Sequence, residues 1–225
     1  MNRSVPWRWR ITARTLIVRF PTPYRTLGWA PLGGGYSRTR LISNHQVDRD
    51  NRRATEHPRV FLRRWIRALE PDADNAVAKA VSMMTGAQVA NAAHVCVRRG
   101  ALAVAAWCTA GCSNALRAGD RATTADIGLG TINLIVAISE PLADAALAEA
   151  IQIATEARVL AVQQAGIIST RSGLPATGTG TDCIVIAAPA GPRAHPWCGK
   201  HTLIGELIAR ATLKSCTRAL ARSRS

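Results

Sequence analysis

Short runs of β-branched and apolar residues, interrupted by prolines and glycines, dominate the first fifty positions. Residues 15–20 read TLIVRF and precede Pro21 and Pro23, which predicts a strand that ends in a turn. Residues 26–32, which lead into three consecutive glycines, and residues 40–47 are candidates for the next two strands. Residues 48–57 are charged and lack periodicity, which predicts a loop.

Helical periodicity begins at Pro58, a residue type favoured at the first position of a helix. Apolar residues then recur at helical spacing, which predicts a helix over 58–70. A second helix is expected over 75–85, capped by Asp74 and closed by Gly86. Two longer amphipathic stretches, 142–165 and 202–220, predict the last two helices.

The remaining apolar runs are typical of strands. Residues 92–97 and 101–108 flank an Arg-Arg-Gly sequence, which predicts a hairpin, and residues 131–139 (TINLIVAIS) predict a central strand. Residues 182–188 predict the last strand. Together these elements predict an α/β fold, a mixed β-sheet covered by α-helices, in a single domain over 15–221 after an irregular basic arm over 1–14.

Composition adds a strong positive charge, because 29 Lys and Arg residues outnumber 14 Asp and Glu residues among the 225, for a net charge of +15. The arginines are scattered, and we find no basic helix interleaved with aromatic residues and no nucleic-acid motif. We therefore expect no nucleic-acid partner. A solvated arginine-rich surface explains the charge most simply, and attraction of an anionic or phosphorylated ligand is an alternative.

The six cysteines lie mostly in apolar runs, which favours free buried thiols in a reducing cytoplasm. The N-terminal apolar stretch is too short for a signal peptide, and no apolar run reaches the roughly 18 residues of a membrane span. No zinc-ligand spacing, P-loop or G-x-S-x-G motif is present, so we expect no metal and no cofactor.

Four polar segments fall at predicted ends of strands or helices, where sites on α/β sheets form. The first combines Gly33–Gly35 with residues 44–47 (NHQV), and the second is 109–114 (TAGCSN). The other two are 177–182 (TGTGTD) and 199–206 (GKHTLIGE). These segments are the candidate walls of a pocket.

The sequence that carries these segments resembles the adenosylcobinamide amidohydrolase family. The motifs TLIVRFPTPYRTLGWAPLGGG, NHQV, TAGCSNALRAGD, GTINLIVAISEPL, IATEARVLAV, ATGTGTDCIVIA and GKHTLIGELI occur in one order over residues 15–220. Arg158 stands where the family pattern leads us to expect lysine, and residues 5–14 and 49–56 match poorly.

The resemblance implies a reaction and a substrate. The family cuts the secondary amide that joins a corrin-ring propionate to aminopropanol in adenosylcobinamide, and releases adenosylcobyric acid for cobalamin salvage. The corrinoid is then the substrate, with no separate cofactor. Cleavage of other, complete cobamides and assembly into a homo-oligomer are left open.

Amide hydrolysis requires activation of water or of a nucleophile, donors that stabilise an oxyanion, and an acid for the leaving amine. The titratable candidates for catalysis are Asp182, His201, Glu206 and Glu156. Each has a structural alternative, such as a carboxylate that accepts loop N–H bonds at 182 or a solvated helix face at 156 and 206.

The candidates for substrate binding are small, amide or cationic residues in the same segments. Asn114 could bond the amides that fringe a corrinoid, Lys200 could stabilise an oxyanion or phosphate, and Ser113 as a nucleophile would need His201 beside it. The full set is Gly34, Gly35, Asn44, Ser113, Asn114, Asn133, Thr179, Thr181 and Lys200.

Two other functional hypotheses compete with the enzyme. A non-catalytic corrinoid carrier would have the same pocket without turnover. A nucleic-acid-binding domain would show an affinity that falls steeply with salt.

Overall fold

The computed structural model describes residues 5–48, 50–71, 78–122 and 130–223. The elements of the N-terminal half are β1 (Arg8–Thr12), β2 (Thr15–Gly28), β3 (Ser37–Gln46), α1 (Arg52–Glu56), α2 (Pro58–Leu69), β4 (Val81–Thr85), a 3-10 turn (Val89–Asn91), β5 (Ala93–Arg99) and β6 (Leu102–Ala110). Those that follow are β7 (Ala115–Leu116), β8 (Ile132–Ile138), α4 (Asp144–Gln164), β9 (Gly178–Thr179), β10 (Cys183–Pro189) and α5 (Leu203–Arg222).

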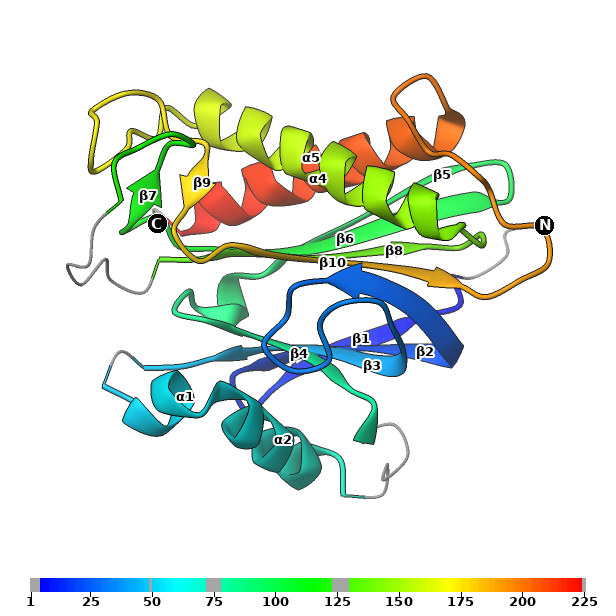
Figure 1. The fold of residues 1–225 in the computed structure, drawn as a ribbon, viewed down its shortest axis with the longest axis horizontal. Helices are drawn as coiled ribbons and strands as arrows, with labels where there is room; N and C mark the ends of the chain where they lie inside the picture. Colours follow the sequence, from blue (N-terminus) through cyan, green and yellow to red (C-terminus); the bar gives the residue numbers. More distant parts are fainter. Residues whose placement is uncertain (1–4, 49, 72–77, 123–129, 224–225) are drawn as a thin grey trace.

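The elements stack in four layers (Figure 1). One mixed eight-stranded sheet runs in the order β4-β3-β2-β10-β8-β6-β5, and β1 pairs with β2. The sheet folds over, so that β1 to β4 face the half formed by β5, β6, β8 and β10. Helices α4 and α5 cover the outer side of the second half, and α1 and α2 lie outside the first. The predicted α/β class with a mixed sheet and covering helices is confirmed.

Strand β2 joins the two halves of the sheet. On one side it pairs with β3 through residues 15–19 and 24–26, and on the other it pairs with β1 through residues 15–19 and with β10 through residues 24–28. The register shifts between Arg19 and Tyr24, where Pro21 and Pro23 lie. Since proline cannot donate to a ladder, the expected turn is instead an irregularity in the pairing within one continuous strand.

Alternating side chains of β6 contribute to two separate cores. Ala105 and Trp107 face the first half of the sheet, whereas Ala106 and Cys108 face α4 and α5. All four are at most 1% exposed. Trp107 packs edge-on against Trp7 with ring centroids 6.4 Å apart. A strand buried on both faces explains the continuous apolar sequence that predicted a hairpin here.

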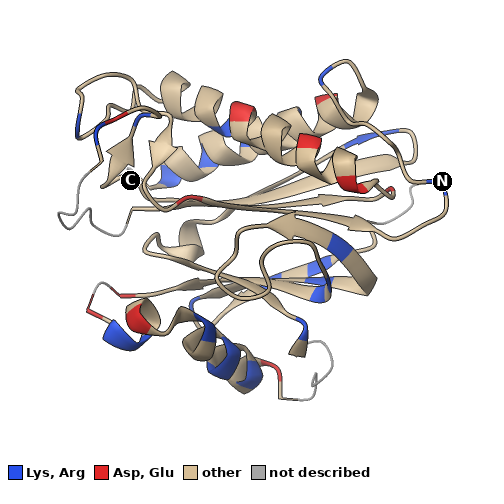
Figure 2. Ribbon diagram, viewed as in Figure 1, with Lys and Arg blue, Asp and Glu red and all other residues tan. Residues whose placement is uncertain are grey.

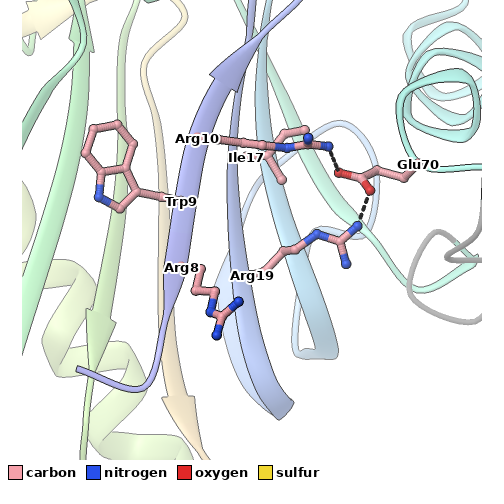
Figure 3. Close-up of a pocket in the computed structure, with 6 residues that line it drawn as sticks. All are labelled: Arg8, Trp9, Arg10, Ile17, Arg19 and Glu70. Atoms are coloured by element: carbon pink, nitrogen blue, oxygen red, sulfur yellow. Dashed lines mark hydrogen bonds and ion pairs between the residues drawn. The ribbon is translucent and has the colours of Figure 1, made fainter. Parts of the chain in front are cut away.

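Residues 8–12 are a strand, which corrects the expectation of an irregular arm. Arg10 donates to Glu70 over 2.7 Å, and Arg19 of β2 pairs with the same carboxylate, which follows α2 and is 7% exposed. Figure 3 shows both guanidinium groups meeting Glu70, with Trp9 on the other side of β1. Trp9 packs there against His94, with ring centroids 5.1 Å apart. These contacts hold β1 to α2 and to the sheet.

Two further expectations are corrected. The helix predicted over 75–85 is wrong at 81–85, which form β4 parallel to β3, while residues 75–77 lie outside the described residues. The buried run Val-Ser-Met-Met-Thr gains a ladder with a central strand, and tertiary pairing outweighs local helix propensity. The loop predicted over 48–57 contains α1, capped by Asn51, whose side-chain oxygen accepts from the Ala54 N–H over 3.1 Å.

No helix in the described part of the chain is long and apolar enough to cross a bilayer.

Candidate functional site

Three buried polar side chains, Asn44 of β3, Thr109 of β6 and Asn133 of β8, meet between the two halves of the sheet; we call them the amide cluster. The Asn44 Nδ2 donates to Thr109 Oγ1 over 2.9 Å, and the Asn133 Nδ2 donates to Asn44 Oδ1 over 2.9 Å. Each of the three residues is 1% exposed. The cluster lies where β3 and β6 end and β8 begins.

A buried ion pair lies beside the amide cluster. Asp182 directly precedes β10 and pairs with Arg158 of α4, and these side chains are 7% and 12% exposed. The carboxylate also accepts from the Ile132 N–H (2.9 Å), the Thr179 N–H (2.9 Å) and the Thr179 hydroxyl (2.5 Å). Burial lowers the pKa of Arg158, yet a guanidinium stays protonated in proteins. Four donors therefore converge on the Asp182 carboxyl group.

Strand β8 connects the ion pair to the amide cluster. Cys183 pairs with Asn133 in the parallel β8–β10 ladder. Just ahead of these strands, the Thr131 and Thr181 hydroxyls are 2.8 Å apart, and Thr181 also donates to the Gly130 carbonyl over 2.9 Å. The amide cluster and the ion pair therefore form one continuous polar region where β8 and β10 begin.

The glycines of the TGTGTD segment make room for the ion pair. A Cβ at Gly178 would lie 2.2 Å from Asp182 Oδ2 and 2.5 Å from Arg158 Nη1. Because both atoms are fixed by the pair, any larger residue at 178 would displace it. The alternation of Gly and Thr thus supplies space for the guanidinium at 178 and donors at 179.

Asn133 offers a hydrogen-bond acceptor for which no donor is found among the described residues. Its Nδ2 donates to Asn44 Oδ1 and to the Met84 carbonyl over 2.7 Å, which fixes the orientation of the amide. Its Oδ1 is buried and accepts no hydrogen bond from the described part of the chain. An unsatisfied buried oxygen costs free energy, and an N–H or O–H of a ligand would remove that cost.

Comparison with known proteins places this chain in a family. The family model of adenosylcobinamide amidohydrolase matches residues 5–225. The chain belongs to the adenosylcobinamide amidohydrolase family. The five segments that meet at the site, NHQV, TAGCSN, GTIN, TEAR and TGTGTD, are all among the motifs that carry the family resemblance.

Two curated relatives match part of the chain. An uncharacterized protein of Methanocaldococcus jannaschii is 43% identical over 93 residues, which is 41% of this chain and 36% of the relative. The adenosylcobinamide amidohydrolase of Halobacterium salinarum is 34% identical over 95 residues, which is 42% of this chain and 37% of the relative. The matches thus span little more than a third of the length of these two relatives.

Two solved structures show weaker likeness. The PH0078 protein of Pyrococcus horikoshii has a TM-score of 0.48 at 11% identity and covers 93% of this chain and 77% of its own. The L-aminopeptidase D-Ala-esterase/amidase of Ochrobactrum anthropi has a TM-score of 0.44 at 13% identity and covers 97% and 83%. At these scores neither likeness bears on the function of this family member.

The structure brings together several of the residues that we selected from the sequence. Asn44 and Asn133 belong to the amide cluster, Asp182 belongs to the ion pair and accepts from Thr179, and Thr181 bonds Gly130 nearby.

Two more of the selected residues lie in the turn after β6, beside this region. Asn114 is 2% exposed and packs against Gly130, where an added Cβ would lie 2.1 Å from its Oδ1. Ser113 is exposed.

The other selected residues lie elsewhere. Lys200 and Glu156 form an exposed pair over 2.7 Å on the outer face of α4, and hydrogen bonds from Lys200 and Gln152 lower the pKa of Glu156. His201 is exposed just before α5, and Glu206 pairs with two arginines. No hydrogen bond or ion pair among the described residues joins Glu156, His201 or Glu206 to Asp182.

Gly34 and Gly35 lie in the loop between β2 and β3, at the far end of β3 from Asn44. The Gly35 N–H donates to the Gly28 carbonyl over 2.7 Å, which closes a turn.

Sequence reasoning missed Arg158 as part of the site, and it selected the segment 109–114 without singling out Thr109. Arg158 follows Ala154 by four residues and precedes Ala161 by three, so it shares the buried face of α4. A lone arginine on an alanine-rich buried face is a signal for a buried carboxylate partner.

No group of three or more His, Cys, Asp or Glu side chains in the described residues is arranged to hold a metal ion.

Proposed function

We propose that this protein hydrolyses the aminopropanol amide of adenosylcobinamide to give adenosylcobyric acid and free aminopropanol, as a step of corrinoid salvage. The observation that carries the proposal is the family match over residues 5–225. Support comes from the meeting of five separate family motifs in one buried polar region. Free cysteines throughout the described residues agree with a reducing cytoplasm as the location.

The amide cluster is proposed to recognise the substrate. A corrinoid carries several amide side chains, and each presents N–H donors. The Oδ1 of Asn133 is a fixed acceptor whose Nδ2 is already engaged on Asn44 and Met84. A substrate N–H that reached this oxygen would gain a hydrogen bond that no described protein group supplies. This preference for a donor favours an amide over an ester or a carboxylate.

Asp182 is proposed to position the site and not to serve as the general base. Its two oxygens already accept from Arg158, from Ile132 and from both donors of Thr179. A proton taken from water would have to displace one of these donors, and the buried guanidinium opposes a neutral carboxyl group. The ion pair instead fixes the loop over 178–182 against the start of β8.

The test is incubation of purified protein with adenosylcobinamide, followed by mass spectrometry for adenosylcobyric acid and aminopropanol. Asn133→Ala should lower turnover strongly, and Asp182→Asn should lower it while the protein stays folded by circular dichroism. Glu206→Gln, on the solvent-exposed face of α5, is the control that should keep wild-type turnover. Binding of the corrinoid without product would favour the carrier, and neither binding nor product would refute the proposal.

A further inference from the structure

A hollow of about 710 Å³ between α2 and the starts of β3 and β4 is lined by four cationic side chains. Arg59 and Arg63 come from α2, Arg38 from β3, and Lys79 from the residues just before β4. Its described lining contains no carboxylate. Figure 2 marks several Lys and Arg positions in blue along the ribbon of α2, at the bottom of the view.

The cations of this hollow differ from other arginines of the fold. Arg10, Arg14 and Arg25 each pair with a carboxylate. In the described part of the chain, no ion pair engages the four cations of the hollow, and the Arg59 Nε donates only to the Pro31 carbonyl over 3.2 Å. Cations that line one hollow repel each other, and the attraction of a bound anion to each of them would offset that repulsion.

A second hollow of about 400 Å³ adjoins the first, because Ser37 and Arg38 line both. Tyr36 also lines it and is 59% exposed. The Tyr36 hydroxyl bonds the Asp144 carbonyl over 3.3 Å, which holds the ring at the rim. A cationic hollow next to an exposed aromatic ring suits a ligand with an anionic chain and a planar group.

We propose that the cationic hollow binds the triphosphate chain of a nucleoside triphosphate, with the base against Tyr36. The four cations line one hollow, as binding of a short chain of phosphates requires, whereas an extended nucleic-acid backbone would need cations spread along a line. The hollow lies at the start of β3, and the amide cluster lies at its end. This proposal is therefore independent of the proposed hydrolysis.

The experiment compares two matched double variants by isothermal titration calorimetry at about 0.15 M salt, where the Debye length is about 8 Å. Arg63→Gln with Lys79→Gln removes two charges from the hollow. Arg64→Gln with Arg67→Gln removes two charges from exposed positions of α2 outside it. ATP and inorganic tripolyphosphate are the probes, and circular dichroism checks that each variant is folded.

We expect the wild-type protein to bind both probes, and the hollow variant to bind each at least about tenfold more weakly. The matched control should change by less than about threefold, since it alters only the more distant, screened field. Tyr36→Ala should weaken ATP and leave tripolyphosphate unchanged, which assigns the nucleoside as part of the ligand. Corrinoid hydrolysis should be unaffected by the hollow variant, so the two proposals fail separately.

Three results would overturn the inference. One is the absence of binding of either probe to the wild-type protein. Another is an equal loss in the two double variants, which would mean a general surface charge. The third is tighter binding of a DNA duplex that depends on both pairs equally. If Tyr36→Ala weakens ATP and tripolyphosphate equally, or weakens neither, the contact between the nucleoside and Tyr36 is refuted. The ligand of the hollow would then be the triphosphate chain alone.

Discussion

Arg158 and Asp182 form a buried ion pair whose removal should destabilise the protein in a way that depends on charge and not on size. Arg158→Met keeps most of the side-chain length and removes the charge. Arg158→Lys keeps the charge and matches the residue type that the family pattern leads us to expect. The two variants therefore separate the contribution of the charge from that of packing.

The expected loss of stability follows from the burial of the ion pair and from the donors that Asp182 keeps. Removing one partner of a buried pair costs about 3–5 kcal/mol, because the other charge stays buried without its counterion. Asp182 would keep its bonds from Ile132 and Thr179, so we expect Arg158→Met to cost about 3 kcal/mol. The Arg158 Nε is buried without a partner in the described residues, and lysine has no such group. Arg158→Lys should therefore cost less than about 1 kcal/mol.

The assay is urea unfolding followed by circular dichroism, extended to a double-mutant cycle with Asp182→Asn. The double variant should be more stable than the sum of the single losses predicts, with a coupling of about 1–3 kcal/mol. Equal stability of the methionine and lysine variants would refute the reasoning, and so would a coupling below about 0.5 kcal/mol.

Three other perturbations test the fold and its electrostatics. Burial and the charge of Arg14 lower the pKa of His45 to about 4. The free energy of unfolding should therefore be highest above pH 6.5 and fall by about 2–3 kcal/mol as the pH falls to 4. Urea unfolding across this pH range should show the fall, and His45→Gln should lack the part that His45 contributes. Glu70→Gln should lower the free energy of unfolding by only about 1 kcal/mol in the same urea experiments, because its two arginine partners are partly exposed. A loss above about 3 kcal/mol would contradict that expectation. Gly28→Ala should lower stability by about 1–3 kcal/mol in thermal melts, since its Cβ would lie 2.3 Å from the Ile184 carbonyl oxygen, and a wild-type melting temperature would show that the backbone moves freely there.

The local sequence pattern predicted most helices and strands, and it failed where pairing with a distant strand determines the secondary structure. The helix predicted over 58–70 appears as Pro58–Leu69, and the hairpin appears as β5 and β6. Both depend on contacts close in sequence. The helix expected over 75–85 failed because Val81–Thr85 gains its bonds from β3, which no local periodicity reveals. The four-layer stacking also depends on pairing between distant segments, such as β2 with β10.

Part of the candidate site could be predicted because its polar residues interrupt strand ends. Asn44, Asn133 and Asp182 were found in this way. Arg158 was missed because a helical charge is usually solvated, and only the burial of its neighbours shows that it points inward. The segment with Lys200 was grouped with the others because it is polar and precedes a predicted helix. Lys200 pairs with Glu156 on the outside of α4, away from the polar region.

The sharing of β2 between the two halves of the sheet has a consequence for how a nascent chain matures. Residue 28 pairs with residue 185, so the first half of the protein cannot complete its ladder until β10 has left the ribosome. Contacts between segments so far apart must close a long loop before they contribute, which slows assembly. Until then the edge of β2 that receives β10 is an unpaired strand edge in a newly made chain. Synthesis of this protein therefore passes through a long interval in which chaperone protection of the N-terminal strands matters more than it does for the finished molecule.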